Sequence, residues 1–379
     1  MLVLRRFTLC LFIMFFGMSC INTTYSRMDE QSISSDEIDL ILGQFAHHSQ
    51  AFYLSEVKRT EALLDTSPKN FDARNDLASA LIKLKQYKRA ESEFLKNEEL
   101  HPNSYETAAN LGVLYKKMKR YGVAAESIQR SLLIKPEGHM GLGDYYLRMI
   151  QWLGKSSNDP AISPVVNFLG IEYGVDPLIV AKHPRVKKSH LLTLIKNDYL
   201  FPDVYCVLGD VYFAEGNYQY ALRCYTRANQ LSQEIGNKVY VSRRTQLFSI
   251  WRKLKTDAHV LSTLQAFDQI DDELNAAKAW TDQFQRLESQ RLQLGLPIDF
   301  ITTKEALLAT GVTKQKVLEA GFFKGEENDE PIDIGGYPSH ESNILVWLIS
   351  LVSLALAITI YLFKRHLNRI KNIQELLPK

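Results

Sequence analysis

The chain has 379 residues, of which 46% are hydrophobic and 23% are charged. This composition is that of a globular protein with ample apolar residues for a core, and it excludes a disordered chain. The net charge is +2, with the excess of basic residues placed at the two ends of the chain. The body between the ends is slightly acidic, so we expect no nucleic-acid ligand for it.

Residues 1–19 have the pattern of a signal peptide. Arg5 and Arg6 precede an apolar stretch that is too short to span a bilayer, and small residues follow it. The end of this segment resembles a bacterial lipoprotein signal, and that resemblance implies lipidation of Cys20. Ordinary cleavage after Ser19, or retention of the segment as a weak anchor, is the alternative.

Residues 20–70 are predicted to form an N-terminal helical cap or a degenerate repeat. The helix expected at 51–67 carries polar side chains on the stripe where packing residues are needed, which fits a capping position. His47 and His48 form the densest histidine pair. They lack further ligands at a suitable spacing, so we expect no metal there.

A repeat occupies residues 71–136. Its period is marked by Pro68, Pro102 and Pro136, which lie 34 residues apart. A fixed period of this length is typical of an array of helix-turn-helix units. Apolar and small residues recur within each unit, namely Leu77, Ala78, Leu81, Ala90 and Phe94, then Leu111, Gly112, Tyr115, Ala124 and Ile128. A third copy at 202–235 contains Leu208, Gly209, Tyr212, Ala221 and Tyr225.

This recurring pattern has a physical explanation. The apolar residues form one stripe on the first helix of a unit, and the small residue lets the second helix approach closely. One hairpin cannot bury its apolar face alone, so the units must stack. The pattern resembles the tetratricopeptide repeat family. That resemblance implies an all-α solenoid of helical hairpins that binds a protein or a peptide segment.

Residues 137–201 depart from the period and form a divergent helical segment. We expect helices at 139–153, 165–175 and 186–198. The basic run at 185–188 is interpreted as a solvated surface, with a phosphate site as the alternative.

Residues 236–294 have a heptad-like pattern that predicts two or three longer capping helices, with breaks near Asp257 and at 268–272. The acidic run at 271–273 is interpreted as the start of a helix, where carboxylates favour the positive end of the helix dipole, rather than as a metal site.

The C-terminal part of the chain predicts a membrane anchor. Residues 295–343 are rich in Gly, Pro and acidic residues and are expected to be a juxtamembrane stalk. Residues 344–363 are uncharged and long enough to cross a bilayer as one helix. The basic tail at 364–379 should be cytoplasmic, which places the body in the periplasm or at the cell surface. The alternative is the reverse topology, with a cytoplasmic body and a retained N-terminal anchor.

Motifs for catalysis are absent from the sequence. There is no phosphate-binding loop, zinc-protease motif, serine-hydrolase motif or Cys-x-x-Cys pair. We therefore expect no enzyme activity, no cofactor, no metal and no small-molecule substrate. Cys206 and Cys224 are expected to be buried free thiols rather than a disulfide. An enzyme or an enzyme accessory subunit, with its site at 137–200 or 239–323, is the alternative.

The predicted binding surface is the groove lined by the first helices of the repeats. Its candidate residues are Asp72, Asn75, Ser79, Lys83, Glu106, Val113, Lys116, Lys117, Asp203, Asp210 and Phe213. Lysines among apolar residues suit an extended peptide or a helix with an acidic anchor, unless these charges only keep the surface soluble. Some members of the repeat family clamp a terminal carboxylate, but the basic residues that this clamp needs are missing here.

These features together predict a membrane-anchored scaffold for protein–protein interaction in the cell envelope. Such a scaffold would serve a secretion, envelope-assembly or signalling complex.

Overall fold

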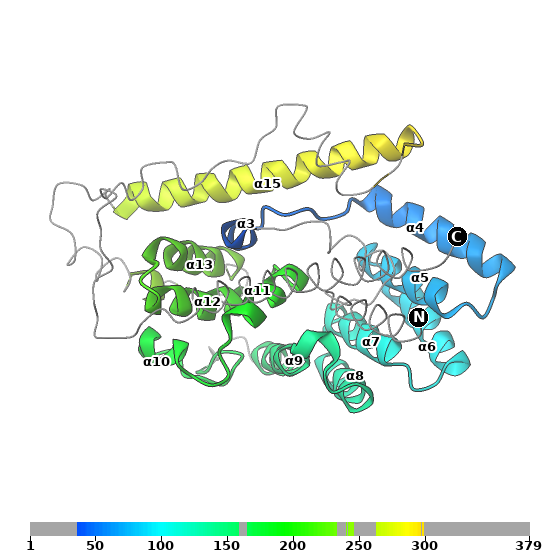
Figure 1. Ribbon diagram of the computed structural model, residues 1–379, viewed down its shortest axis with the longest axis horizontal. Coiled ribbons are helices and arrows are strands. Elements are labelled where there is room, and N and C mark those ends of the chain that lie inside the picture. Colours follow the sequence, from blue (N-terminus) through cyan, green and yellow to red (C-terminus); the bar gives the residue numbers. More distant parts are fainter. Residues whose placement is uncertain are drawn as a thin grey trace, which may run out of the picture. The chain divides into compact units, whose positions relative to one another are not determined.

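The computed structural model describes residues 36–158, 165–232, 240, 242–245, 263–296 and 298 (Figure 1). All of them belong to the first of two compact units, which divide at residue 325. The predicted signal peptide at 1–19, Cys20, nearly all of the stalk, the span at 344–363 and the tail at 364–379 lie outside the described residues. Within the described residues, no helix combines the length and the apolar character needed to cross a membrane.

Three helical hairpins stand where the repeat pattern predicts them. They are α5 (Phe71–Lys83) with α6 (Tyr87–Leu100), α7 (Tyr105–Lys117) with α8 (Tyr121–Ile134), and α12 (Pro202–Ala214) with α13 (Tyr218–Leu231). Successive hairpins also contact each other, since α6 packs on α7. The described residues are helical apart from turns and one isolated bridge, so the expectation of helical hairpins is confirmed for them.

The small residue on the first helix of a hairpin is required by close packing. A Cβ atom added to Gly112 would lie 2.4 Å from Ile128 Cδ1, and one added to Gly209 would lie 2.4 Å from Tyr225 Cε1. Both distances are well below an ordinary van der Waals contact, so only glycine fits without movement of the second helix or its side chain. The facing alanines on the second helices, Ala90, Ala124 and Ala221, are fully buried.

The turn inside each hairpin contains one residue in the left-handed region. These residues are Lys85 (φ 60°), Lys119 (φ 59°) and Gly216 (φ 75°). In each turn, three backbone N–H groups bond to carbonyl groups in the last turn of the first helix. The N–H of Lys119, for example, donates to the Lys116 carbonyl at 3.0 Å. These bonds satisfy carbonyl groups that the helix end would otherwise leave unpaired.

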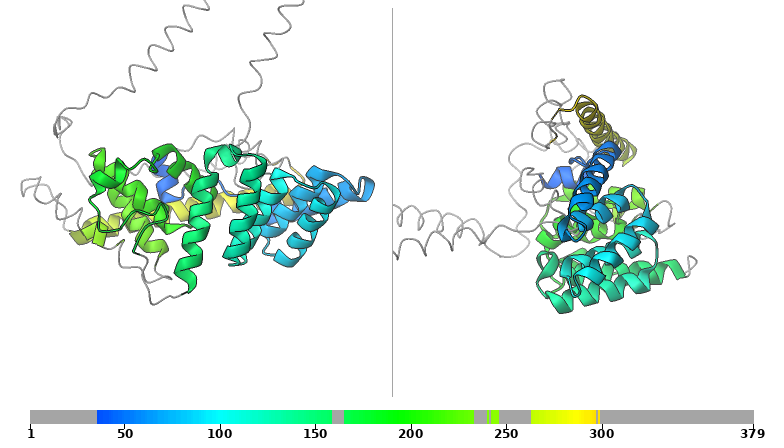
Figure 2. Two further views of the ribbon diagram at one scale, coloured as in Figure 1. Left: turned by 90° about the horizontal axis from the view of Figure 1, so that it is seen from below. Right: turned by 90° about the vertical axis from the view of Figure 1, so that its right-hand side faces the viewer.

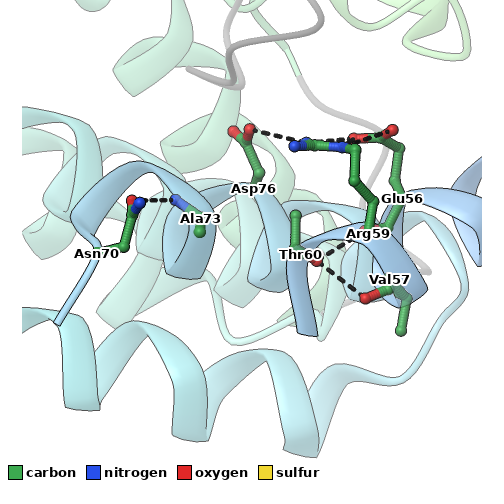
Figure 3. A network of polar contacts seen from close by, with 7 residues as sticks. All are labelled: Glu56, Val57, Arg59, Thr60, Asn70, Ala73 and Asp76. Atoms are coloured by element: carbon green, nitrogen blue, oxygen red, sulfur yellow. Dashed lines mark hydrogen bonds and ion pairs between the residues drawn. The ribbon is translucent and has the colours of Figure 1, made fainter. Parts of the chain in front are cut away.

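Helix α4 (Gln50–Thr66) confirms the helix expected at 51–67, and it packs on α5. Arg59 pairs with Glu56 at 2.7 Å and lies 3.5 Å from Asp76 on α5 (Figure 3). Thr60 is fully buried, and its hydroxyl donates to the carbonyl groups of Glu56 and Val57. The polar stripe that sets α4 apart from a regular repeat therefore has bonding partners in the fold.

The helices of the divergent segment differ in part from those expected. It begins with η1 (Gly138–Gly141) and α9 (Gly143–Asn158). The helix expected at 165–175 is wrong. That stretch is a loop closed by an antiparallel bridge between Val166 and Glu172.

The Asn167 side chain explains the loop, because it accepts hydrogen bonds from the N–H groups of Leu169 and Ile171. An asparagine that bonds to nearby backbone competes with helix formation. The short α10 (Pro177–Ala181) follows, and α11 (Lys188–Asn197) confirms the helix expected at 186–198.

Helix α15 (Thr263–Gln293) is continuous through residues 268–272, so the predicted helix break at these residues is wrong. The helix continues because buried side chains follow one another at helical spacing through this stretch, with Ile270, Leu274 and Ala277 all in the main core. Residues 271–273 therefore lie inside a helix and not at its start. The helix ends before Gly295 (φ 66°), as the glycine there predicts.

The N-terminal segment and α15 lie on one side of the hairpins (Figures 1 and 2). Helix α3 (Glu37–Leu42) contacts α11, α13 and α15, and the connector at 43–49 leads from it to α4. Helix α15 contacts α13 of the last hairpin, α3, and α4 beside the first hairpin. It therefore spans from one end of the described array to the other.

Candidate functional site

Three lysines lie at the C-terminal ends of the first helices α5 and α7. They are Lys83, Lys116 and Lys117, and we call them the lysine cluster. The negative end of a helix dipole favours positive side chains, so the helix ends support this placement. Lys83 and Lys117 are exposed, whereas Lys116 is buried.

Asp198, the residue that follows α11, faces this cluster. Its carboxylate forms an ion pair with Lys116, and its second oxygen lies 3.9 Å from Lys117 Nζ. The Lys116 ammonium also lies 4.9 Å from the centre of the Tyr146 ring, a cation–π arrangement. Lys116 is thus fixed in the structure, and the two exposed lysines form the accessible part of the cluster.

The charges in the cluster affect each other. The pKa of Lys117 is lowered to about 8 by the protein packed around its amine and by the neighbouring charge of Lys83. This shift occurs although 41% of the Lys117 side chain is solvent-exposed. Lys117 is therefore a cation at neutral pH that loses its charge in mildly alkaline solution.

His47 of the connector lies next to the lysine cluster. Its ring stacks on Tyr199 with 4.3 Å between ring centres, and Phe45 lies 4.1 Å away on the same measure. Burial, and after it the charge of Lys83, lowers the pKa of His47 to about 3. The ring is therefore neutral at physiological pH, and it adds an aromatic surface beside the lysines.

The predicted groove residues fall into three sets. Three are exposed (Asp72, Lys83 and Lys117), two are partly buried (Glu106 and Phe213), and six are buried (Asn75, Ser79, Val113, Lys116, Asp203 and Asp210). The three exposed residues are accessible to a partner in the folded chain. A binding role for any of the eleven stays a prediction.

The buried amides and the hydroxyl join neighbouring repeats. The side-chain amide of Asn110 on α7 donates to Asn75 Oδ1 at 2.9 Å and to Ser79 Oγ at 3.5 Å, both on α5. Buried polar groups need such partners. We infer that Asn75 and Ser79 hold the two first helices in register.

Asp203 on α12 is fully buried and accepts three hydrogen bonds. The donors are the Phe168 N–H at 2.6 Å, the Tyr173 hydroxyl at 2.6 Å and the Tyr240 hydroxyl at 3.0 Å. Burial raises the pKa of Asp203 to about 6, although these bonds oppose the shift. Asp203 thus ties the loop at 165–175 and residue 240 to the last hairpin.

Asp210 lies about two turns further along α12 and is also buried among bonding partners. It accepts a hydrogen bond from the Tyr225 hydroxyl at 2.7 Å and faces Arg243 at 3.2 Å. Burial raises its pKa to about 6. Sequence reasoning placed both aspartates in an open groove, because all their partners except Tyr225 come from segments that carry no repeat signal.

A second polar site, which the sequence did not indicate, surrounds Glu37 of α3. Its carboxylate accepts a hydrogen bond from the Tyr212 hydroxyl at 2.5 Å and pairs with Lys188 at 3.2 Å. Lys188 also pairs with Glu215 at 2.9 Å and lies over the Tyr212 ring at 4.4 Å. This part of the basic run at 185–188 is therefore engaged by carboxylates of the same chain.

Other candidate chemistry is accounted for by packing. Cys206 and Cys224 are buried free thiols, as expected. Glu273, from the acidic run at 271–273, forms a buried bidentate ion pair with Arg223, with both N–O distances at 2.8 Å. The part of the chain that the structure describes contains no group of three or more potential metal ligands.

Comparison with known proteins bears on the hairpins. The tetratricopeptide repeat family model matches residues 105–137 and 202–235. These matches coincide with α7–α8 and α12–α13, while α5–α6 has the same hairpin form without a match. No curated protein was found to match the chain.

Proposed function

We propose that this chain, which carries tetratricopeptide repeats, is a scaffold that binds an acidic segment of a partner protein. Repeats of this family generally bind proteins or peptides, and two of the hairpins match its model. The observation that favours an acidic partner is the lysine cluster at the ends of α5 and α7. The proposal includes no enzyme activity, cofactor or metal.

The arrangement of the cluster supports this choice. Lys83 and Lys117 are exposed on adjacent first helices, and the charge of Lys83 adds to the effect of burial in lowering the pKa of Lys117. Binding of a carboxylate between them would relieve the repulsion of the two ammonium groups. His47 and Tyr199 provide aromatic surface next to the charges, so a segment with acidic and apolar residues would match both.

We further propose that the scaffold works in the cell envelope. The support is the agreement of two sequence features, the signal-peptide pattern at 1–19 and the apolar span at 344–363 with its basic flank. Both place the repeats outside the cytoplasm. Protease added to intact spheroplasts tests this placement, because it should digest the repeats and spare the tail. Repeats that survive digestion would refute it.

Crosslinking in membranes tests the scaffold itself. We expect the wild-type chain to capture a protein partner, and the double variant Lys83→Glu/Lys117→Glu to lose it. Lys116 stays unchanged, because its buried ion pair would make its loss a folding defect. The matched control is Lys88→Glu/Lys96→Glu, with the same charge change at exposed sites on α6. Failure to capture a partner, or capture that the cluster variant retains, would contradict the proposal.

The pH dependence of binding gives an independent test. As pH rises through about 8, Lys117 loses its proton and its attraction for an acidic segment. One exposed ion pair contributes up to about 1 kcal/mol, so the affinity should fall up to about fivefold between pH 7 and pH 9. Lys117→Arg keeps its charge across this range and should remove that part of the pH dependence. An identical profile for both chains would contradict the role of Lys117.

A further inference from the structure

Helix α3 lies on the surface of the last hairpin without being part of any hairpin. It contacts α11, α13 and α15, and its Glu37 contacts Tyr212 on α12. It has only six residues, and so short a helix is not stable alone in water. Its helical form therefore depends on this docking, as for a short helix bound in the groove of another protein.

The polar contact of α3 is specific for a carboxylate. Glu37 Oε2 is within reach of both the Tyr212 hydroxyl, at 2.5 Å, and the Lys188 ammonium, at 3.2 Å. Lys188 is held over the Tyr212 ring, so one hydroxyl and one ammonium point at the same oxygen. The site is half-open, with 42% of the Glu37 side chain exposed.

The apolar contact follows one turn later. Leu40, Ile41 and Leu42 are all almost completely buried, and they join the core cluster that contains the apolar residues of α12 and α13. Burying three aliphatic side chains stabilises the docked helix far more than a half-exposed ion pair does. The aliphatic triplet therefore supplies most of the affinity, and Glu37 fixes the register.

The connector after α3 is held by backbone contacts. Gly43 ends the helix with φ 75°, and the Arg227 guanidinium lies against it. Further on, Gln285 of α15 donates to the carbonyl groups of His47 and His48, and Glu288 accepts from the Ser49 N–H at 2.6 Å. The connector leads directly to His47, beside the lysine cluster.

We propose that α3 is an internal ligand of this scaffold. The surface formed by α11, α12 and α13 is a binding site for a short helix with a glutamate one turn before three consecutive aliphatic residues. A partner protein with this pattern replaces α3. The inference rests on the proposed scaffold function and specifies the chemistry of the partner.

The connector at 43–49 tethers α3 to its site and makes it hard for a partner to displace. A segment joined by a short connector has an effective concentration on the order of millimolar at its site, so an external helix with the same contacts alone cannot compete. The partner therefore needs an additional contact. The lysine cluster offers one, because His47 of the connector stacks on Tyr199 at 4.3 Å, and the neighbouring Asp198 pairs with Lys116 and lies 3.9 Å from Lys117. A helix followed by an acidic segment would engage both.

Binding of a defined peptide to the full chain tests the site. The probe is a fluorescently labelled peptide with the sequence of residues 36–49. In the Glu37→Lys chain, the tethered α3 should be repelled by Lys188 and leave the site accessible. We expect this chain to bind the probe at least about tenfold more tightly than the wild-type chain does. Glu99→Lys, an exposed site on α6, is the control with the same charge change and should behave as wild type.

A second variant checks that binding occurs at this surface. Adding Lys188→Glu to Glu37→Lys should abolish binding of the probe and restore docking of the tethered helix, because the two charges are then exchanged. Equal affinity of the Glu37→Lys and wild-type chains for the probe would overturn the proposal. So would a Glu37→Lys/Lys188→Glu chain that binds the probe as tightly as the Glu37→Lys chain does. A Glu37→Lys chain that fails to fold would also overturn it, because an internal ligand must be dispensable for folding.

One further outcome concerns the occupant of the site, and the choice of probe separates this inference from the scaffold proposal. A wild-type dimer that Lys188→Glu dissociates would overturn it, because the occupant would then be α3 of a second copy. The probe is defined, so its binding does not depend on the membrane crosslinking experiment. Failure of either experiment thus leaves the other interpretable.

Discussion

The close approach of α12 and α13 at Gly209 allows a quantitative test of the repeat packing. In a Gly209→Ala chain, the new Cβ would lie 2.4 Å from Tyr225 Cε1 and 2.6 Å from Tyr225 Cδ1. The ring is 1% exposed, and its hydroxyl is held by Asp210 at 2.7 Å. It therefore cannot move aside without losing that bond or disturbing the core.

The expected loss of stability follows from three contributions. Overpacking a core costs about 1–3 kcal/mol, and a strained or broken hydrogen bond to a charged group costs about 1.5–3 kcal/mol more. Replacing glycine by alanine within a helix returns about 1 kcal/mol. We therefore expect Gly209→Ala to lower the free energy of unfolding by roughly 1.5–5 kcal/mol.

Urea unfolding followed by circular dichroism measures this change. The matched control is Gly122→Ala on α8, where nothing lies within 4 Å of the added Cβ. That variant should be as stable as wild type or up to about 1 kcal/mol more stable. Gly112→Ala should fall between them, because the nearest atom is the flexible end of Ile128. If Gly209→Ala proved as stable as Gly122→Ala, the packing argument would be wrong.

Three further predictions concern stability, each measured by urea unfolding. Glu273→Gln should lower the free energy of unfolding by about 3 kcal/mol, because the charge of Arg223 is then buried without its carboxylate. Replacing both residues by apolar ones should recover most of that stability. A Glu273→Gln chain as stable as wild type would refute the role of the pair. Lys119→Gly should gain about 1 kcal/mol by removing the strain of a left-handed residue (φ 59°), and a loss would refute that cause. The pKa of Asp203 is raised to about 6 from 3.8, so its contribution is most favourable below pH 3.8 and is lost as pH rises through 6. Relative to wild type, Asp203→Asn should therefore gain about 3 kcal/mol between pH 4 and pH 7, and parallel pH profiles would contradict the shift.

The hairpins could be predicted because their determining contacts are local. Gly112 and Ile128, or Gly209 and Tyr225, are 16 residues apart within one unit, and the same spacing recurs in each copy. The period therefore indicates both the helices and the residues that face each other. The candidate lysines could be placed on first helices for the same reason.

The divergent helices were predicted less well. Asn167 bonds to the backbone at 169 and 171 and makes a loop where apolar residues suggested a helix. Asp271, Asp272 and Glu273 suggested a helix start, yet the helix runs through them because apolar side chains on either side of them are buried in the core, and Glu273 is paired with Arg223, 50 residues away in the sequence. In both cases the deciding contacts are ones that the average pattern of the segment does not reveal.

By itself, the sequence determined the all-helical repeat, the close contact at its small residues and the positions of the exposed lysines. Only the tertiary structure decided what covers the array. Glu37 meets Tyr212 across 175 residues, and His48 meets Glu288 across 240 residues. Contacts of this range have no period and no local motif, because they depend on where folding brings the two ends of the array. The docking of α3, and the position of α15 along the array, could therefore be recognised only in the folded chain.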